Sequence, residues 1–317
     1  MKKILLTGST AQDSLLFIKY ALSQENIEIV GLTVSDNETF KKDFDRKLLI
    51  IKVRKNEYLK IFKKIIDDFK PDWVINFMGI TSSQSVNNYD YETMQANLYL
   101  PIEFLKYYFK VKKDGKFFQP SSSYVFQKSK LDIDEKSAKL PSTVYGHCKN
   151  LLDKACEDYR KKGFFCINAY LFSHESFLRN KKSFSMRIID RLKTHDKSKE
   201  LIIDSWDNLN DWSTAESIVD FVYKALDADI NSDFVVGSGI LSSVFDYIVA
   251  INNEFSIIDP NLIVKGKPSD ETDFRLANSS KAQKLLGWQP TSSIEQVSLC
   301  LRKQDLKFLR KLPVKNY

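Results

Sequence analysis

Short apolar runs alternate with longer amphipathic stretches along the first half of the chain. The runs with strand character cover 3–8, 27–34, 47–53, 72–77, 116–121 and 164–172. The helical patterns between them cover 13–23, 57–69, 91–109 and 146–162. Strands that alternate with helices predict a parallel, doubly wound α/β sheet. Because the strands are apolar almost throughout, we expect the sheet to be covered on both faces.

The pattern changes after about residue 173. "STAESIVDFVYKAL" has helical spacing and "DFVVG" has strand character, so both are expected to return to the sheet. The stretches on either side of them mix short helical and strand patterns. We therefore predict one sheet domain, residues 1–172 with about 212–239, and a smaller mixed α/β lobe made of about 173–211 and 240–317.

Composition changes this picture little. Of the 317 residues, 43% are hydrophobic and 28% are charged, which is typical of a globular protein. No apolar run is long enough to span a bilayer, and "MKKILLTGST" turns polar too soon for a signal peptide, so a cytoplasmic location is expected. The formal net charge of +7 comes from lysines interspersed with acids, which indicates a solvated surface and no nucleic-acid motif.

The thiols and imidazoles show no spacing typical of a metal site. The four cysteines are Cys148, Cys156, Cys166 and Cys300, and none forms a CxxC pair. The three histidines are His147, His174 and His195. We expect free thiols in a reducing compartment and no bound metal.

The first strand runs into a turn and a helix in "ILLTGSTAQDSLL". Gly8 would turn the chain so that backbone N–H groups and the helix start face a pyrophosphate, as in a Rossmann-type dinucleotide domain. Ala11 and Ser14 stand where further glycines are usual, so the motif by itself fits an ordinary strand and helix equally well. Asp36, after the second strand, could accept a hydrogen bond from a ribose hydroxyl, which favours NAD and leaves NADP as the alternative.

Hydroxyls end the fifth predicted strand in "PSSSYVF", and "YGHCK" follows at the start of a helix. Tyr145 and Lys149 are one helical turn apart, and an ammonium group beside a phenol is predicted to lower the phenol pKa from about 10. Such a tyrosine can exchange a proton with a sugar hydroxyl or carbonyl, and Ser122 could bind the same oxygen. A lone YxxxK more often marks a solvated helix face. Its place after a strand-end hydroxyl in a doubly wound fold indicates a site.

Several stretches in order carry a resemblance to a known family. They are "TGSTAQD", "VINFMGITSS", "ANLYLPIEFL", "FFQPSSSYVF", "YGHCK", "AYLFSHESFLRNKKSFSMRI", "NDWSTAESIVDFV" and "SKAQKLLGWQP". Across nearly its whole length the chain resembles the extended short-chain dehydrogenase/reductases, the NAD-dependent epimerase/dehydratase family that acts on nucleotide sugars. "LFSHES" points to the GDP-mannose 4,6-dehydratase branch.

The resemblance implies a role for each matching position. Tyr145 would be the acid/base, Lys149 its electrostatic partner and ribose ligand, and Ser122 the hydroxyl that polarises the C4 oxygen of the sugar. The residues implied at an NAD or NADP cofactor are Gly8, Ala11, Gln12, Asp13, Asp36 and Gly79, with Asn97 on the following helix. Those implied at a nucleotide-sugar substrate are Thr81, Ser82, Ser173, His174, Glu175, Arg187 and Lys267. A homo-oligomer, dimer or tetramer, is implied through the helices near 91–109 and 146–162.

The chain departs from the family pattern at three places. The 4,6-dehydratases carry a glutamate two residues after the catalytic hydroxyl, which removes the C5 proton while water leaves C6, and this position is Tyr124. A phenol is a poor base for a carbon acid at neutral pH. Asn210 stands where arginine is frequent, and "KVRKN" ends the third strand where an aspartate commonly meets the adenine.

Three functions remain open on these grounds. The first is a GDP-mannose-type nucleotide-sugar enzyme that transfers hydride at C4, as a 4-ketoreductase or 4-epimerase. The second is a 4,6-dehydratase with a non-standard base, for which Glu175 is one candidate. The third is a catalytically silent binding or partner subunit, which the eroded glycines favour and the retained Ser122, Tyr145 and Lys149 oppose.

Overall fold

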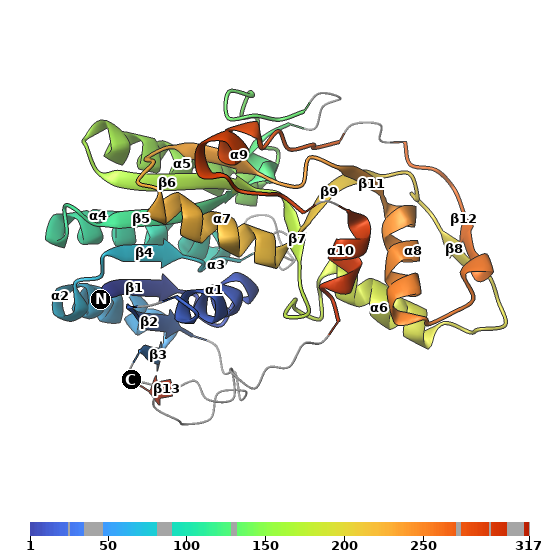
Figure 1. Cartoon of the computed structure of the whole chain (residues 1–317), viewed down its shortest axis with the longest axis horizontal. Coiled ribbons are helices and arrows are strands. Elements are labelled where there is room, and N and C mark those ends of the chain that lie inside the picture. The colour runs from blue at the N-terminus through green and yellow to red at the C-terminus, as the bar shows by residue number, and fades with distance from the viewer. Residues whose placement is uncertain are drawn as a thin grey trace.

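The computed structural model describes residues 1–24, 26–34, 47–80, 91–127, 132–270, 274–291, 293–302 and 314–316. Its main feature is a parallel sheet in the order β10-β6-β5-β4-β1-β2-β3-β13 (Figure 1). The strands are β1 (Lys2–Thr7), β2 (Ile27–Thr33), β3 (Leu48–Lys52), β4 (Trp73–Asn76), β5 (Lys116–Ser122), β6 (Phe165–Leu171), β10 (Asp233–Val236) and β13 (Val314–Asn316). The predicted α/β class and its parallel sheet are confirmed.

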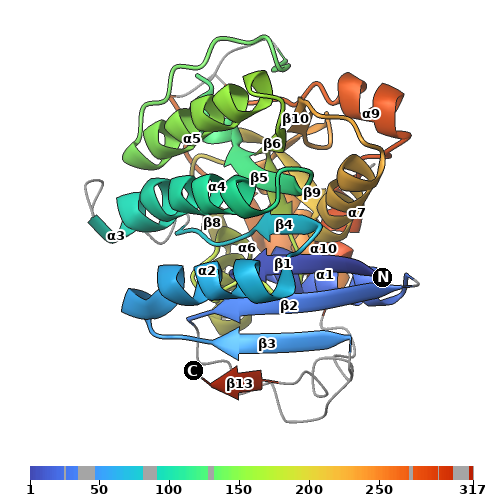
Figure 2. The same cartoon turned by 90° about the vertical axis from the view of Figure 1, so that its left-hand side faces the viewer.

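Helices cover both faces of this sheet (Figure 2). One face carries α2 (Tyr58–Phe69), α4 (Leu100–Val111) and α5 (Val144–Lys161), and the other carries α1 (Gln12–Leu22), α7 (Ala215–Asp227) and α9 (Ser280–Leu286). The amphipathic spacing explains the packing, since α2 turns an apolar stripe to the sheet. The buried members of that stripe are Tyr58, Ile61, Phe62, Ile65 and Ile66.

The helix predicted over 91–109 is built from several pieces. It consists of α3 (Tyr91–Met94), one turn of π-helix (η2, Gln95–Tyr99) and α4. The short 3-10 turns η1 (Lys55–Glu57) and η3 (Ser123–Val125) precede α2 and follow β5. A π turn widens the helix by one residue and is frequent beside functional sites. Here it carries Asn97 toward the end of β4.

The second lobe has its own small sheets and core (Figure 1). Strands β7 (Ser173–Glu175), β9 (Leu209–Thr214) and β11 (Leu241–Ser243) form one sheet, and β8 (Leu201–Ile203) pairs with β12 (Ile263–Lys265). The helices of the lobe are α6 (Phe184–Thr194), α8 (Val244–Phe255) and α10 (Ile294–Leu299), with the short turn η4 (Pro260–Leu262). Trp212 and Tyr247 pack at its centre with ring centroids 4.5 Å apart.

Two parts of 240–317 lie against the main sheet, not in the smaller lobe where the sequence placed them. Helix α9 and Trp288 pack on α7, and β13 pairs in parallel with β3. Apolar periodicity shows that a segment is buried but not which core covers it, and β13 is too short to be recognised as a strand. Residues 215–236 return to the main sheet through α7 and β10, whereas 212–214 lie in β9 of the small sheet.

The Asp211 carboxylate ties the two lobes together. Asp211 lies in β9 of the small sheet, yet it accepts hydrogen bonds from the Ser238 N–H (2.8 Å) and the Ser238 hydroxyl (2.6 Å), just after β10. The N–H groups of Gly239 (2.9 Å) and Ala277 (3.1 Å) donate to its other oxygen. Burial raises the pKa of this carboxyl, against the lowering effect of its hydrogen bonds.

Four further findings concern membrane-spanning helices, cysteines, metal ligands and exposed residues on the helices. Among the described residues, no helix combines the length and the hydropathy that a membrane span requires. All four cysteines are free and buried. The described part of the chain shows no cluster of ligands suited to a metal ion. Tyr91, Tyr99 and Leu151 are exposed on the helices expected to pair, and the homo-oligomer itself stays a prediction.

Candidate active site

A cavity of about 190 Å³ opens where β4, β5 and β6 end, beside the start of α1. The carboxyl ends of parallel strands meet at one edge of a sheet, which is where such folds bind ligands. The predicted site residues that line this cavity are Asp13, Gly79, Ser122, Tyr124, Tyr145, Lys149, Ser173 and His174. Asn97, Met78, Ile80 and Arg179 also contribute to its wall.

Ser122 and Tyr145 face each other across this cavity. Ser122 is the last residue of β5, and Ser122 and Tyr145 both line the cavity. Burial raises the pKa of Tyr145 to about 12, although the Ser122 hydroxyl opposes the shift. The phenol is therefore protonated at neutral pH. The structure brings the two residues of the predicted pair to one cavity, and their catalytic role stays a prediction.

Lys149 does not lower the phenol pKa as the helical spacing predicted. Its ammonium donates to the Pro120 carbonyl at 2.9 Å and lies 5.7 Å from the centre of the Tyr145 ring. The residue is only 5% exposed, and burial lowers its own pKa to about 8. Because both groups are buried, desolvation of each outweighs their mutual attraction. The prediction that Lys149 lowers the pKa of Tyr145 is therefore wrong.

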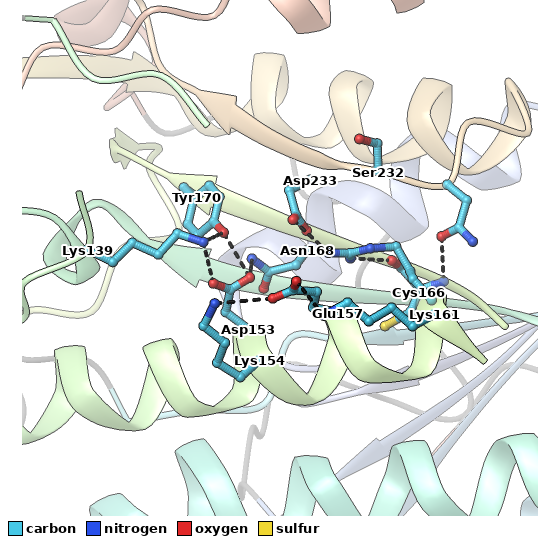
Figure 3. Close-up of polar contacts among 12 residues, drawn as sticks. Lys139, Asp153, Lys154, Glu157, Lys161, Cys166, Asn168, Tyr170, Ser232 and Asp233 are labelled. Carbon is cyan, nitrogen blue, oxygen red and sulfur yellow. Dashed lines mark hydrogen bonds and ion pairs between the residues drawn. The ribbon is translucent and has the colours of Figure 1, made fainter. Parts of the chain in front are cut away.

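Helix α5 is fixed at its start and again two turns further on. The Thr143 side chain caps the helix by accepting from the Gly146 N–H at 3.1 Å. Gly146 is required because a Cβ there would meet the Tyr124 carbonyl oxygen at 2.5 Å. Two turns after Tyr145, Lys139 and Tyr170 converge on the buried Asp153 carboxylate (Figure 3). These contacts set where Tyr145 and Lys149 point.

Tyr124 occupies the position at which the resemblance implies a glutamate in the 4,6-dehydratases. Its backbone N–H donates to the Ser122 hydroxyl oxygen at 3.2 Å, so the turn η3 holds both residues together. The Tyr124 ring is 38% exposed and meets the Tyr145 ring edge-on, with centroids 6.1 Å apart and an interplanar angle of 84°. An aromatic wall thus replaces an acidic group next to the proposed acid/base.

His174 bonds to the first turn of α1. Its Nε2 lies 3.1 Å from an Asp13 oxygen, and its Nδ1 lies 2.7 Å from the Phe172 carbonyl. Burial works against a charge on the imidazole, yet the Asp13 carboxylate raises the pKa of His174 above its ordinary value. Gln12 donates to Asp13 and accepts from the Ser176 hydroxyl. Sequence-adjacent Gln12 and Asp13 are thereby joined to the "SHES" stretch.

Glu175 is not brought into the cavity. It is 2% exposed and accepts from the Arg179 Nε at 3.0 Å. Burial raises the pKa of its carboxyl, against the pull of Arg179. Neighbouring residues of a strand point to opposite sides, so when His174 faces the cavity Glu175 must face away. A base role for Glu175 has no support in this geometry.

The turn predicted after the first strand contains Gly8 in a left-handed backbone conformation, and its contact with a phosphate stays a prediction. Gly8 has φ +66°, and a Cβ there would lie 2.7 Å from the Met78 nitrogen, so only glycine fits. Ser14 donates its hydroxyl to the Gly8 carbonyl at 2.9 Å, which replaces a glycine without loss of close packing. The Gly8 N–H donates to the Tyr58 hydroxyl at 3.1 Å. Ala11 precedes α1 and supplies no side-chain cap.

The remaining predicted positions fall in three groups. Asn97 bonds to both backbone groups of Ile80, which fixes the loop after β4 beside Gly79. Arg187 and Lys267 are exposed in the second lobe and do not line the cavity, so their role at phosphates stays a prediction. Asp36, Thr81 and Ser82 lie outside the described residues.

Sequence reasoning missed two arginines near the site. Arg179 lies in "RNKK", where it looked like one more surface base, yet it lines the cavity and holds Glu175. Arg275 stacks its guanidinium on the Tyr124 ring, 4.9 Å from the ring centre. Arg179 follows His174 by only five residues, and this closeness could have indicated that it lies near the site. No local feature of the sequence points to Arg275.

Comparison with known proteins gives a consistent result. The family model described as GDP-mannose 4,6 dehydratase matches residues 5–299. A GDP-mannose 4,6-dehydratase of Vibrio cholerae is 24% identical over 353 residues, covering 96% of this chain and 94% of that protein. A GDP-mannose 4,6 dehydratase of Drosophila melanogaster is 25% identical, covering 64% of this chain and 58% of that protein, so that match spans just over half of the relative.

Solved structures share the fold at low identity. A dTDP-glucose 4,6-dehydratase from Bacillus anthracis, in complex with NAD, has a TM-score of 0.79 at 16% identity, covering 95% of this chain and 96% of its own. A UDP-glucuronic acid 4-epimerase from Bacillus cereus, in complex with UDP-glucuronic acid and NAD, has a TM-score of 0.77 at 18% identity, covering 94% and 97%.

Proposed function

The chain belongs to the GDP-mannose 4,6 dehydratase family, and within it we propose a nucleotide-sugar enzyme that transfers hydride at C4 and does not eliminate water. The observation that carries this proposal is the Ser122–Tyr145 pair beside Tyr124 in one cavity. The pair keeps the groups that hydride transfer needs. The carboxylate that elimination needs is replaced by a phenol.

The residues present fit a nicotinamide dinucleotide. The first turn of α1 lacks a side-chain cap among the described residues, so its N–H groups and positive dipole end suit a pyrophosphate. The Lys149 ammonium has the Pro120 carbonyl as its described partner and keeps further donors for ribose hydroxyls. Similar proteins of known structure are complexes with NAD. When bound, the dinucleotide supplies the hydride acceptor or donor.

The protein residues would move and hold the proton. With a pKa of about 12, the Tyr145 phenol keeps its proton at neutral pH and can give it to a C4 carbonyl oxygen as that carbon is reduced. The Ser122 hydroxyl donates to the same oxygen and stabilises its growing charge. The same two groups can take the proton back in the reverse direction, so this chemistry serves a 4-ketoreductase and a 4-epimerase alike.

The alternative of a 4,6-dehydratase with a different base loses its candidate. Glu175 points away from the cavity and is held by Arg179. Asp13 does line the cavity, but His174 and Gln12 occupy both of its oxygens. The alternative of a silent subunit is opposed by the presence of Ser122, Tyr145 and Lys149 in one cavity.

The test uses two incubations of the full chain, each followed by mass spectrometry of the sugar nucleotide. The first adds GDP-4-keto-6-deoxymannose with NADH or NADPH, and the second adds GDP-mannose alone. We expect the keto sugar to gain two hydrogens while the absorbance of the reduced cofactor falls. Loss of one water from GDP-mannose would show a dehydratase and contradict the proposal.

Binding of the dinucleotide should depend on the charge of Lys149. Because burial lowers the Lys149 pKa to about 8, its ammonium is present below that pH and is lost above it. A charge-assisted hydrogen bond is about twice as strong as a neutral one. We expect NADH affinity, measured by fluorescence titration, to fall about tenfold from about pH 7 to about pH 9.

The matched variant is Lys149→Met, which keeps a side chain of similar length and removes the positive charge. It should bind NADH more weakly at every pH, with the pH dependence abolished. The other titratable groups against Lys149 are Tyr145, Cys148 and Cys156, and burial raises the pKa of each of them above its ordinary value. An unchanged slope in Lys149→Met would show that one of these groups is responsible.

A further inference from the structure

The Tyr124 ring is held between two other side chains. The Tyr145 ring meets it edge-on, with centroids 6.1 Å apart. On another side the Arg275 guanidinium carbon lies 4.9 Å from the ring centre, within the range of a cation–π interaction. The residue that replaces the dehydratase carboxylate therefore has a cation stacked on it.

Arg275 is fixed by the backbone around it. Its Nε donates to the Phe126 carbonyl at 3.0 Å, two residues beyond Tyr124. Its own segment is joined to Ile133, whose N–H donates to Leu276 and whose carbonyl accepts from Asn278. These contacts hold the guanidinium over the turn that carries Ser122 and Tyr124. Its position is therefore fixed by a hydrogen bond to the backbone and by the pairing of its own segment with Ile133.

We infer that Arg275 is a positioning residue which, through residue 124, commits this site to hydride transfer without elimination. The inference rests on the proposed function and deepens it. In the present chain Arg275 holds the Tyr124 ring as one wall of the cavity. It also makes the site unsuited to a base at that position, so two residues determine the outcome.

Electrostatics explains why Arg275 makes the site unsuited to a base at position 124. A glutamate at position 124 would reach about as far as the ring centre does now, within ion-pairing range of the Arg275 guanidinium. Arginine is a bidentate partner for carboxylates, and pairing lowers the carboxylate pKa and occupies its oxygens. Such a carboxylate is a weak base, so restoring the acid alone does not restore elimination.

The reaction that Arg275 would suppress is a balanced β-elimination. In a 4-keto sugar, the C5–H bond breaks and its proton goes to the carboxylate. The C6–O bond breaks, and the leaving hydroxyl takes that proton and departs as water. The C5=C6 double bond forms with no net oxidation.

The experiment compares four proteins: wild type, Tyr124→Glu, Arg275→Gln and the double variant Tyr124→Glu/Arg275→Gln. Each is incubated with NAD⁺ and GDP-mannose, and the loss of one water is followed by mass spectrometry. We expect no loss from wild type or Arg275→Gln, a trace from Tyr124→Glu, and at least a tenfold higher rate from the double variant. Tyr124→Glu/Arg275→Lys should resemble Tyr124→Glu alone, since it keeps the cation.

A ligand-free measurement separates this inference from the proposed function. Thermal midpoints of wild type, Tyr124→Leu, Arg275→Gln and their double variant form a cycle. The fall in thermal midpoint caused by Arg275→Gln should be smaller when residue 124 is leucine. If the falls in thermal midpoint of the two single variants add up to that of the double variant, the inference is wrong, whichever reaction the protein catalyses. It is equally wrong if Tyr124→Glu eliminates water as fast as the double variant, or if the folded, NAD⁺-binding double variant eliminates none.

Discussion

Tyr145→Phe should abolish nearly all hydride transfer while the protein stays folded. The substitution removes the hydroxyl that the proposed function assigns to proton exchange with the C4 oxygen, in a cavity that Tyr145 and Ser122 both line. General acid catalysis contributes about a hundredfold to ten-thousandfold, so kcat should fall by about that factor.

The measurement is the oxidation of NADH in the presence of the keto sugar, with kcat and KM determined separately. NADH affinity should change little, because Lys149 keeps its bond to the Pro120 carbonyl. Tyr107→Phe is the matched control, since it removes a phenol that bonds to Asp67 on the outer helices. Retention of more than about a tenth of the wild-type rate would mean that another group supplies the proton.

Asp211→Ala should cost about 4 kcal/mol of unfolding free energy. The substitution leaves three backbone N–H groups without their acceptor, in a place where Asp211 is only 2% exposed, and leaves the Ser238 hydroxyl with only its longer bond to the Ile240 carbonyl. Each buried donor left without a partner costs about 1–3 kcal/mol, partly recovered if water enters. The loss should be larger than for most single substitutions.

Urea unfolding followed by tryptophan fluorescence measures this effect, with Asp246→Ala as the control. Asp246 is an exposed carboxylate that completes the capping box at the start of α8, so its removal should cost about 1 kcal/mol. Asp211→Asn should fall between the two, because one oxygen still accepts. Equal midpoints for Asp211→Ala and Asp246→Ala would mean that the junction between the lobes is not held by this carboxylate.

The parts of the site that were predictable depend on neighbouring strand ends. Ser122 ends β5, and α5 begins where the chain turns back beside it, so a parallel sheet brings Ser122 and Tyr145 together without further information. Their roles follow from chemistry at that edge. The same reasoning places Asp13, Gly79 and His174 at the cavity.

The errors have identifiable physical causes. Spacing along α5 showed that Lys149 lies near Tyr145, but not that burial would dominate the pKa of each group. Glu175 was expected beside His174 because the two are adjacent, and a strand turns adjacent residues to opposite sides. Neither depth of burial nor strand conformation could be read from so short a stretch.

Arg275 was unpredictable for a different reason. Its contact with Tyr124 joins residues far apart in the chain and depends on the bridge between Ile133 and Ala277. Nothing in "DFRLANSS" distinguishes it from a surface arginine. Contacts of this kind follow from how the lobes meet, which sequence periodicity does not encode.

Strand β13 has a consequence for how the protein is made. It pairs with β3, whose partner residues Ile50, Ile51 and Lys52 are synthesised long before Val314 to Asn316. Until then β3 presents an open strand edge, and open edges recruit strands from other molecules. Loop closure over so many residues is also slow. Nascent chains should therefore be most prone to aggregation after β3 has been synthesised and before β13 pairs with it, and chaperone dependence should be concentrated in that interval.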